Sequence, residues 1–193
     1  MFILLGFSIL ALAIILIKLI KYAIEETHNT KKLDTIISKL NRTNAKKLLA
    51  EIQKIKNPIA RVIELVIITK NDRRFDKESR ESEISRMASI QIRSLENYLG
   101  ALEVVANISP LLGLFGTVLG MIKAFLNLEK AGSQIDPALL AGGIWEALLT
   151  TAFGLTIAIT ALAAYHLFEN KISNTKDKLK DGLILLAQKE DGK

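Results

Sequence analysis

The chain has 193 residues, of which 50% are hydrophobic and 24% are charged, with a net charge of +6. It is too apolar for an ordinary soluble domain and too charged for a chain buried wholly in lipid. The absence of cysteine excludes disulfides, thiolate metal sites and a cysteine nucleophile. The charges are segregated, because residues 1–17, Val104–Ile122 and Ala147–Tyr165 contain no Asp, Glu, Lys, Arg or His. At about 1.5 Å per helical residue, runs of this length match the hydrocarbon thickness of a bilayer and predict membrane-spanning helices.

The first apolar run predicts a transmembrane helix over residues 1–20. It has neither the basic N-terminal region nor the small-residue cleavage site of a signal peptide, and Lys18 and Lys21 follow it instead. Between Lys18 and Glu103 there are 18 Lys and Arg against 12 Asp and Glu. Basic residues concentrate on the cytoplasmic side of membrane spans, so we expect the N-terminus outside and Lys18 inside. Without an aromatic-rich basic surface, the charge does not indicate nucleic-acid binding.

Residues 21–102 predict a cytoplasmic helical region. Asn57-Pro58 interrupts the helical pattern, and residues 70–74 predict a turn. From about Lys77 the pattern leads into the second span without a breaker, so one long helix is expected there. Apolar residues recur at helical spacing in three earlier stretches: Leu33, Ile36, Ile37 and Leu40; Leu48, Leu49, Ile52 and Ile55; and Ile59, Val62, Ile63, Val66 and Ile67.

The rest of the chain predicts a second transmembrane helix over residues 103–127, a short periplasmic connection over 128–143, and a third transmembrane helix over 144–168. Gly132, Asp136-Pro137 and Gly142-Gly143 are turn signals in the connection, and Pro137 suits the start of a short interfacial helix. Residues 169–193 predict a cytoplasmic C-terminal helix. The fold class is therefore an all-α membrane protein with three transmembrane helices, the second and third extended into a cytoplasmic helical bundle.

Small and hydroxyl-bearing residues share one face on each of the last two spans. They are Gly113, Gly116, Thr117 and Gly120 on the second, and Thr150, Thr151, Gly154, Ala158 and Ala161 on the third. One interpretation is close helix packing, with each threonine bonded to the carbonyl four residues before it in its own helix. The other is a partly polar interior that serves transport. Neither span has an ionisable residue at membrane depth, so in a proton-driven device another subunit must supply the carboxylate.

Two further residues are site candidates. Glu146 lies at the start of the predicted third helix. One interpretation is that the helix dipole stabilises an acid there, and the other is that Glu146 lies at the outer mouth of a pathway. Pro110 lies early in the second span and is expected to kink the helix, which makes it a hinge candidate. The composition predicts no cofactor and no metal set, and an enzyme is the least favoured class.

The chain resembles the MotA/TolQ/ExbB proton-channel family. The resemblance lies in residues 112–122 (LGLFGTVLGMI) with Phe125, and in residues 143–155 (GIWEALLTTAFGL) with Ala158-Ile159. Three spans with one cytoplasmic insertion are similar to the ExbB and TolQ branch, since flagellar MotA subunits have four spans. Family members commonly have proline where this chain has Thr160, so a gating role that rests on that proline does not carry over.

The resemblance implies a homopentamer in the bacterial inner membrane around a single-span partner of the ExbD/TolR type, whose transmembrane Asp carries protons. By motif position it implies that Thr117, Thr151 and Glu146 line the proton pathway, with Thr150 as an adjacent hydroxyl. The implied work is uptake through a TonB-like protein. The alternatives are a TolQ-like envelope motor acting through a TolA-like protein, a MotA-like stator, and a membrane scaffold that conducts nothing.

Overall fold

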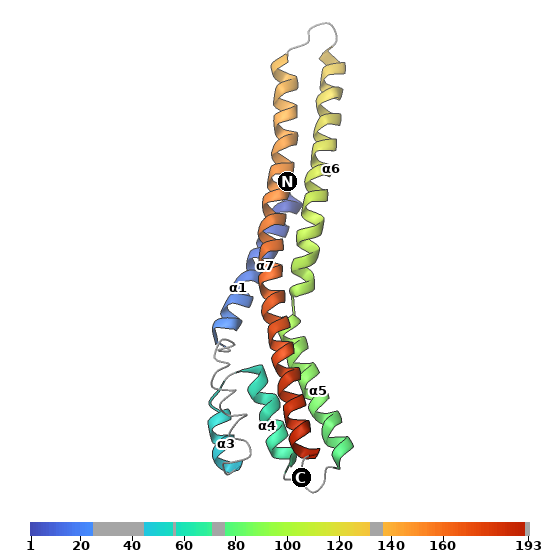
Figure 1. The fold of residues 1–193 in the computed structure, drawn as a ribbon. Coiled ribbons are helices and arrows are strands. Elements are labelled where there is room, and N and C mark those ends of the chain that lie inside the picture. The colour runs from blue at the N-terminus through green and yellow to red at the C-terminus, as the bar shows by residue number, and fades with distance from the viewer. Residues whose placement is uncertain (25–44, 56, 71–75, 132–136, 192–193) are drawn as a thin grey trace. The chain divides into compact units, whose positions relative to one another are not determined.

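The computed structural model describes residues 1–24, 45–55, 57–70, 76–131 and 137–191. The predicted stripe at Leu33–Leu40 and the turn at residues 71–74 lie outside this range. Within it, the regular structure is helical and no strand occurs. The helices are α1 (Phe2–Ile24), α3 (Ala45–Ile52), α4 (Pro58–Lys70), α5 (Lys77–Glu96), α6 (Leu99–Ala131) and α7 (Pro137–Asp191), as Figure 1 shows.

Three helical stretches of the described chain are long and apolar enough to cross a membrane: Phe2–Ala23, one within Lys77–Lys130, and one within Leu140–Asp181. The all-α class with three spans is therefore confirmed. Large apolar side chains are exposed along these helices, as lipid or a partner requires. Which end of each span faces the cytoplasm remains a prediction.

The chain forms two compact units. Residues 1–16 and 98–168 make the span unit, which holds α6, most of α1 and the first part of α7. Residues 17–97 and 169–193 make the bundle unit, which holds α3, α4, α5, the end of α1 and the rest of α7.

The core of the bundle unit forms where the sequence predicts an apolar stripe on α4. Asn57 precedes this helix, and its side-chain oxygen accepts the amide of Ile59 at 2.9 Å, while Pro58 occupies the first helical position. Burying the stripe of α4 against α3 and α5 removes it from water, which is the main stabilisation of a short helix. The core consists of Ile52, Ile59, Ala60, Val62, Ile63, Ile67, Ala88 and Leu179, with Leu49, Ile55, Ile84, Met87 and Ile92 against it.

The N-terminus of α5 is capped by Asp76. Its carboxylate accepts the backbone amide of Ser79 at 2.9 Å. Hydrogen bonds from Ser79, through its side chain first and its backbone second, lower the pKa of Asp76 below its ordinary value of 3.8. The cap fixes where α5 begins.

The expected uninterrupted helix from Lys77 into the second span is not what the structure shows. Helix α5 ends at Glu96 and α6 begins at Leu99, with Tyr98 in the left-handed region at φ 66°. No glycine or proline stands at either of the two intervening positions, Asn97 and Tyr98. The local sequence therefore gave no sign of this break.

The connection between the last two spans also differs from the expectation. Helix α6 continues to Ala131 and passes through Pro110, while α7 already begins at Pro137. The predicted turn at Gly142-Gly143 is wrong, because both residues lie inside α7. Packing explains why a glycine occupies this helical position, since a methyl group placed on Gly143 would lie 2.7 Å from Cβ of Ala124.

Candidate functional site

Helices α6 and α7 run side by side in the span unit and meet along small residues (Figure 1). Their order is antiparallel, since residues later on α6 meet residues earlier on α7. We call this contact the α6–α7 seam. Its members are Ser109, Gly113, Gly116, Gly120 and Ala124 on α6, and Gly143, Ala147, Thr150, Thr151 and Gly154 on α7.

The closest approach in the seam is backbone to backbone. A methyl group on Gly154 would lie 2.6 Å from the carbonyl oxygen of Ser109 and 3.0 Å from Cα of Gly113. A methyl group on Gly113 would in turn lie 3.0 Å from Cα of Thr151. At Gly154 a side chain would therefore require the backbone to shift, and at Gly113 it would require the backbone of Thr151 to give by a few tenths of an ångström.

Along the rest of the seam, glycines face side chains. A methyl group on Gly116 would meet the hydroxyl oxygen of Thr150 at 2.7 Å, and one on Gly120 would meet Cβ of Ala147 at the same distance. Ala158 is buried on α7, at the position after Gly154 that shares its face. The sequence-based site included Gly113, Gly116, Gly120, Gly154 and Ala158, but it missed Ser109, Ala124, Gly143 and Ala147. Ser109, Ala124 and Ala147 lie three or four residues from predicted members, and Gly143 lies four residues before Ala147, so helical spacing is the signal that could have found them.

Only one of the three candidate threonines bonds across the seam. Thr151 donates its hydroxyl to the carbonyl oxygen of Gly113 at 2.9 Å. Thr150 donates to the carbonyl of Ala147 at 2.6 Å, and Thr117 donates to that of Leu114 at 2.7 Å, each within its own helix. These internal bonds reach three residues back, where the packing interpretation expected four.

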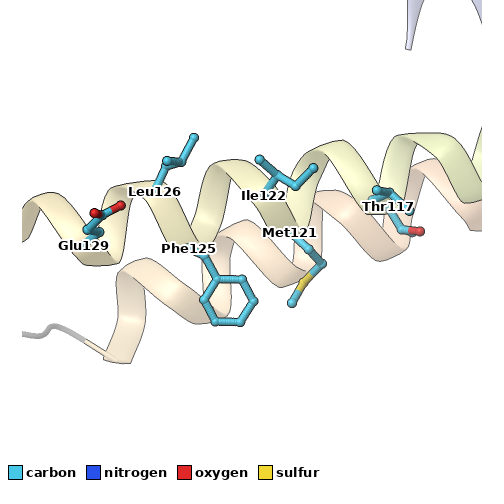
Figure 2. A pocket seen from close by; sticks show the side chains of 7 residues that line it. Thr117, Met121, Ile122, Phe125, Leu126 and Glu129 are labelled. Atoms are coloured by element: carbon cyan, nitrogen blue, oxygen red, sulfur yellow. The ribbon is translucent and has the colours of Figure 1, made fainter.

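Thr117 lies apart from the seam contacts and lines an open pocket on α6 (Figure 2). Met121 and Phe125 project to one side of the helix in this pocket, and Glu129 lies at its far end. Sequence reasoning did not single out Glu129. The full lining is Thr117, Val118, Met121, Ile122, Phe125, Leu126 and Glu129, so a hydroxyl and a carboxylate bound an otherwise apolar surface.

Glu146 lies further into its helix than the sequence suggested. Because α7 begins at Pro137, Glu146 is more than two turns from the helix start, and the first turn of α7 contains no acid. The helix dipole acts mainly within the first turn, so it does not account for this residue. Glu146 is exposed, and no titratable group belongs to the seam itself.

Comparisons with known proteins identify the group of proteins to which this site belongs. The model of the MotA/TolQ/ExbB proton channel family matches residues 39–181, which include the bundle core, the seam and the pocket. The biopolymer transport protein ExbB of Pseudomonas putida is 28% identical over 166 residues, covering 80% of this chain and 50% of the relative.

Two shorter matches are closer in sequence. The biopolymer transport protein exbB1 of Vibrio cholerae is 38% identical over 109 residues, covering 56% of this chain and 48% of its own length. The Tol-Pal system protein TolQ of Haemophilus influenzae is 49% identical over 76 residues, covering 39% of this chain and 33% of the relative. The chain thus spans about half the length, or less, of these relatives. On the family match and these relatives, the chain belongs to the MotA/TolQ/ExbB proton channel family, in its ExbB/TolQ branch.

Proposed function

We propose that the chain is the channel-forming subunit of a motor driven by the proton gradient across the bacterial inner membrane. Protons pass between this subunit and a single-span partner of the ExbD/TolR type, whose transmembrane Asp binds and releases them. The observation that carries the proposal is that the family match includes two spans with threonine hydroxyls and no ionisable residue at membrane depth. A carboxylate from elsewhere completes such a pathway, because intramembrane proton relays use ionisable groups.

Within this proposal, Thr117 and Thr151 take different roles. Thr151 is held in the seam by its bond to Gly113, so its first role is to fix the two helices together. Thr117 is only partly buried and lines the pocket, so its hydroxyl is the one that a partner carboxylate reaches. Each proton that crosses the membrane potential releases about 2.3 kcal/mol per 100 mV, and several protons per cycle suffice for mechanical work.

The proposed assembly is a homopentamer with the N-terminus in the periplasm and the C-terminus in the cytoplasm. Its proposed work is TonB-dependent uptake, because the ExbB relatives match over longer stretches of the chain. A TolQ-like role in envelope integrity is the second candidate, supported by the higher identity of the TolQ match over 76 residues. Deleting the gene separates them: iron starvation supports uptake, and detergent sensitivity supports the envelope role.

The proposal is tested by purifying the complex from native membranes and measuring its mass, which gives the ring size and reveals any small single-span partner. Proton flux is then measured in liposomes that contain the chain with and without that partner. We expect flux only with the partner, and a Thr117→Val variant should lose most of it while assembling normally. Flux without a partner, or undiminished flux in Thr117→Val, contradicts the proposal.

A matched control is available on the neighbouring helix. The hydroxyl of Thr156 is exposed and bonds within its own helix to the carbonyl of Ala152 at 2.8 Å, much as Thr117 bonds to Leu114. Thr156→Val should therefore leave flux unchanged. Equal loss of flux in both variants would show that the effect comes from general disturbance of the spans.

A further inference from the structure

Helices α6 and α7 each have an exposed face on the side opposite the seam, which we call the back face. At about 100° per residue, positions half a turn away from the seam residues recur at intervals of three and four. The back face consists of Leu111, Phe115, Val118, Ile122, Phe125 and Glu129 on α6, and of Trp145, Leu149, Ala152, Thr156 and Ile159 on α7. Each of these residues is exposed in the span unit.

The two back faces differ in the size of their side chains. On α6, Leu111 and Phe115 are both more than half exposed, so large apolar groups project from the helix. On α7, Ala152 and Thr156 are small, and small residues let a second helix approach closely. A surface of large side chains and a surface of small ones are complementary in shape.

The seam fixes which residues lie at the same level along the two antiparallel helices. Gly113 meets Gly154 in the seam. Leu111, two residues before Gly113, is therefore level with Thr156, two residues after Gly154. A large side chain on one back face is thus level with a small side chain on the other.

Three turns further along α6, the size relation is reversed. Gly120 meets Ala147 in the seam, so Ile122 is level with Trp145. Ile122 and Phe125 line the open pocket on α6 (Figure 2). Trp145 is the only tryptophan of the chain, and it is 69% exposed. The largest side chain on the back face of α7 therefore lies at the level where the back face of α6 is hollowed.

We propose that the back face of α7 in one copy of the chain packs against the back face of α6 in the next copy. Copies inserted into a membrane in the same orientation are related by rotation about an axis along the membrane normal, which leaves the level of every residue unchanged. Leu111 of one copy then meets Thr156 of the next, and the side chain of Trp145 enters the pocket.

The contact is head to tail, because the two back faces are different and lie on opposite sides of each copy. Such a contact repeats from copy to copy until a ring closes. The inference rests on the homo-oligomer of the proposed function, but not on proton conduction. Thr117 lies to the side of the back face, so its hydroxyl stays available to the carboxylate of the single-span partner.

Charge complementarity favours a second copy over lipid as the occupant of the pocket. Among the described residues that line the pocket, Glu129 is the one with a charge. Side chains lean toward the N-terminus of their own helix, so in antiparallel helices Trp145 and Glu129 lean toward each other. The indole N–H lies at the positive edge of the ring and donates to a carboxylate. A lipid acyl chain offers no such donor.

Cross-linking in native membranes tests the contact, and the full-length chain suits this test because it contains no cysteine. The variant Leu111→Cys with Thr156→Cys is treated with a short bifunctional thiol reagent. The two positions lie on opposite sides of the α6–α7 pair, so links join neighbouring copies. We expect a ladder of covalent dimers, trimers and larger species on a denaturing gel. If the wild-type complex has the mass of an oligomer and no ladder forms, the inference is overturned.

Two controls make the cross-linking pattern specific. Leu111→Cys alone or Thr156→Cys alone should give no link, because a head-to-tail contact does not bring the same residue of two copies together. Leu111→Cys with Trp145→Cys uses the same two faces at the wrong level, since Trp145 is level with Ile122, about 16 Å from Leu111 along the helix. Strong dimers from a single-cysteine variant indicate a two-fold contact and overturn the inference.

Trp145→Ala tests the pocket itself. Removing the indole should raise the dissociation constant of the purified oligomer in detergent by about tenfold or more. Phe153→Ala is the matched control, because Phe153 is an exposed aromatic residue of α7 that lies off the back face. It should have a much smaller effect. Equal weakening in the two variants, or none in Trp145→Ala, contradicts the contact.

These outcomes separate the contact from the proposed function. If the ring cross-links as expected but conducts no protons with a partner, the proposed channel fails and the contact stands. If the ring conducts protons but the back faces do not cross-link, the contact fails and the proposed channel stands. A chain that is a monomer in native membranes contradicts both.

Discussion

The hydroxyl of Thr151 donates to the carbonyl of Gly113 at 2.9 Å, and so joins α7 to α6 within the part of the seam where backbone meets backbone. The adjacent Thr150 has the same chemistry but bonds within its own helix. Two neighbouring threonines therefore have different structural roles, which the sequence alone did not separate. Substitution by valine, which has nearly the same shape, removes the hydroxyl in each case.

Thr151→Val should destabilise the span unit, because it removes the bond across the seam. Hydrogen bonds between membrane helices contribute about 0.6 kcal/mol on average and up to about 1.7 kcal/mol. Thr150→Val loses only a bond within its helix and should have a smaller effect. Thermal unfolding of both variants in detergent checks this, and equal destabilisation would contradict the assignment.

Gly154→Ala should weaken the seam more than any other glycine substitution along it. The added methyl group would lie 2.6 Å from the backbone carbonyl of Ser109, and backbone cannot move aside as a flexible side chain can. Overpacking of this kind costs about 1–3 kcal/mol. The loss should appear as a lower unfolding temperature of the purified protein.

Gly142→Ala on the same helix is the control for this substitution. No atom lies within 4 Å of a methyl group placed there, so the helix should gain roughly 0.5–1 kcal/mol from the better helix former. Opposite signs for the two variants are expected. A loss of stability in Gly142→Ala would mean that this face is covered in the assembly.

Ile67→Ala should destabilise the bundle unit, and Ile68→Ala should not. The two residues are adjacent on α4, but Ile67 is 4% exposed in the core and Ile68 is 49% exposed. Truncating a buried isoleucine to alanine costs about 2–5 kcal/mol. Limited proteolysis of α4 in the intact protein provides the readout, and equal cleavage of both variants would contradict the core assignment.

The cap at Asp76 predicts a pH dependence at the start of α5. Because hydrogen bonds from Ser79 lower the pKa of Asp76, its stabilising effect is fully present above pH 3.8 and is lost as the pH falls through the lower folded value. Exchange of the Ser79 amide, corrected for its intrinsic rate, should accelerate over that range. Asp76→Ala should show the fast rate at every pH, while Glu81→Gln, an exposed acid one turn on, should behave like wild type.

The sequence predicted the helices well where the pattern was repeated over many residues. The stripe from Ile59 to Ile67 indicated which face of α4 is buried, and uncharged runs indicated the spans. The prediction failed where contacts between residues distant in the sequence determine the backbone conformation. Gly142-Gly143 looked like a turn because paired glycines usually mark one. The sequence could not show that Ala124 approaches Gly143 so closely that a glycine is needed inside the helix.

The site was predicted in part for the same reason. Helical spacing identified the glycines that the structure places in the seam, but it could not tell which threonine bonds across to α6. Glu129 was missed because it lies beyond the apolar run, three turns from Thr117. The break at Tyr98 was missed because neither Asn97 nor Tyr98 is a glycine or a proline, the residues that usually mark the end of a helix.

In the α6–α7 seam, the small residues of α6 pack against the small residues of α7. The side chains that α6 exposes away from the seam are large, and Leu111, Phe115 and Phe125 are each more than half exposed. A partner helix that packs on this face of α6 would therefore meet large apolar side chains and not a surface of small residues. Gly113, Gly116 and Gly120 of α6 are turned toward α7, so they do not contribute to this outward surface.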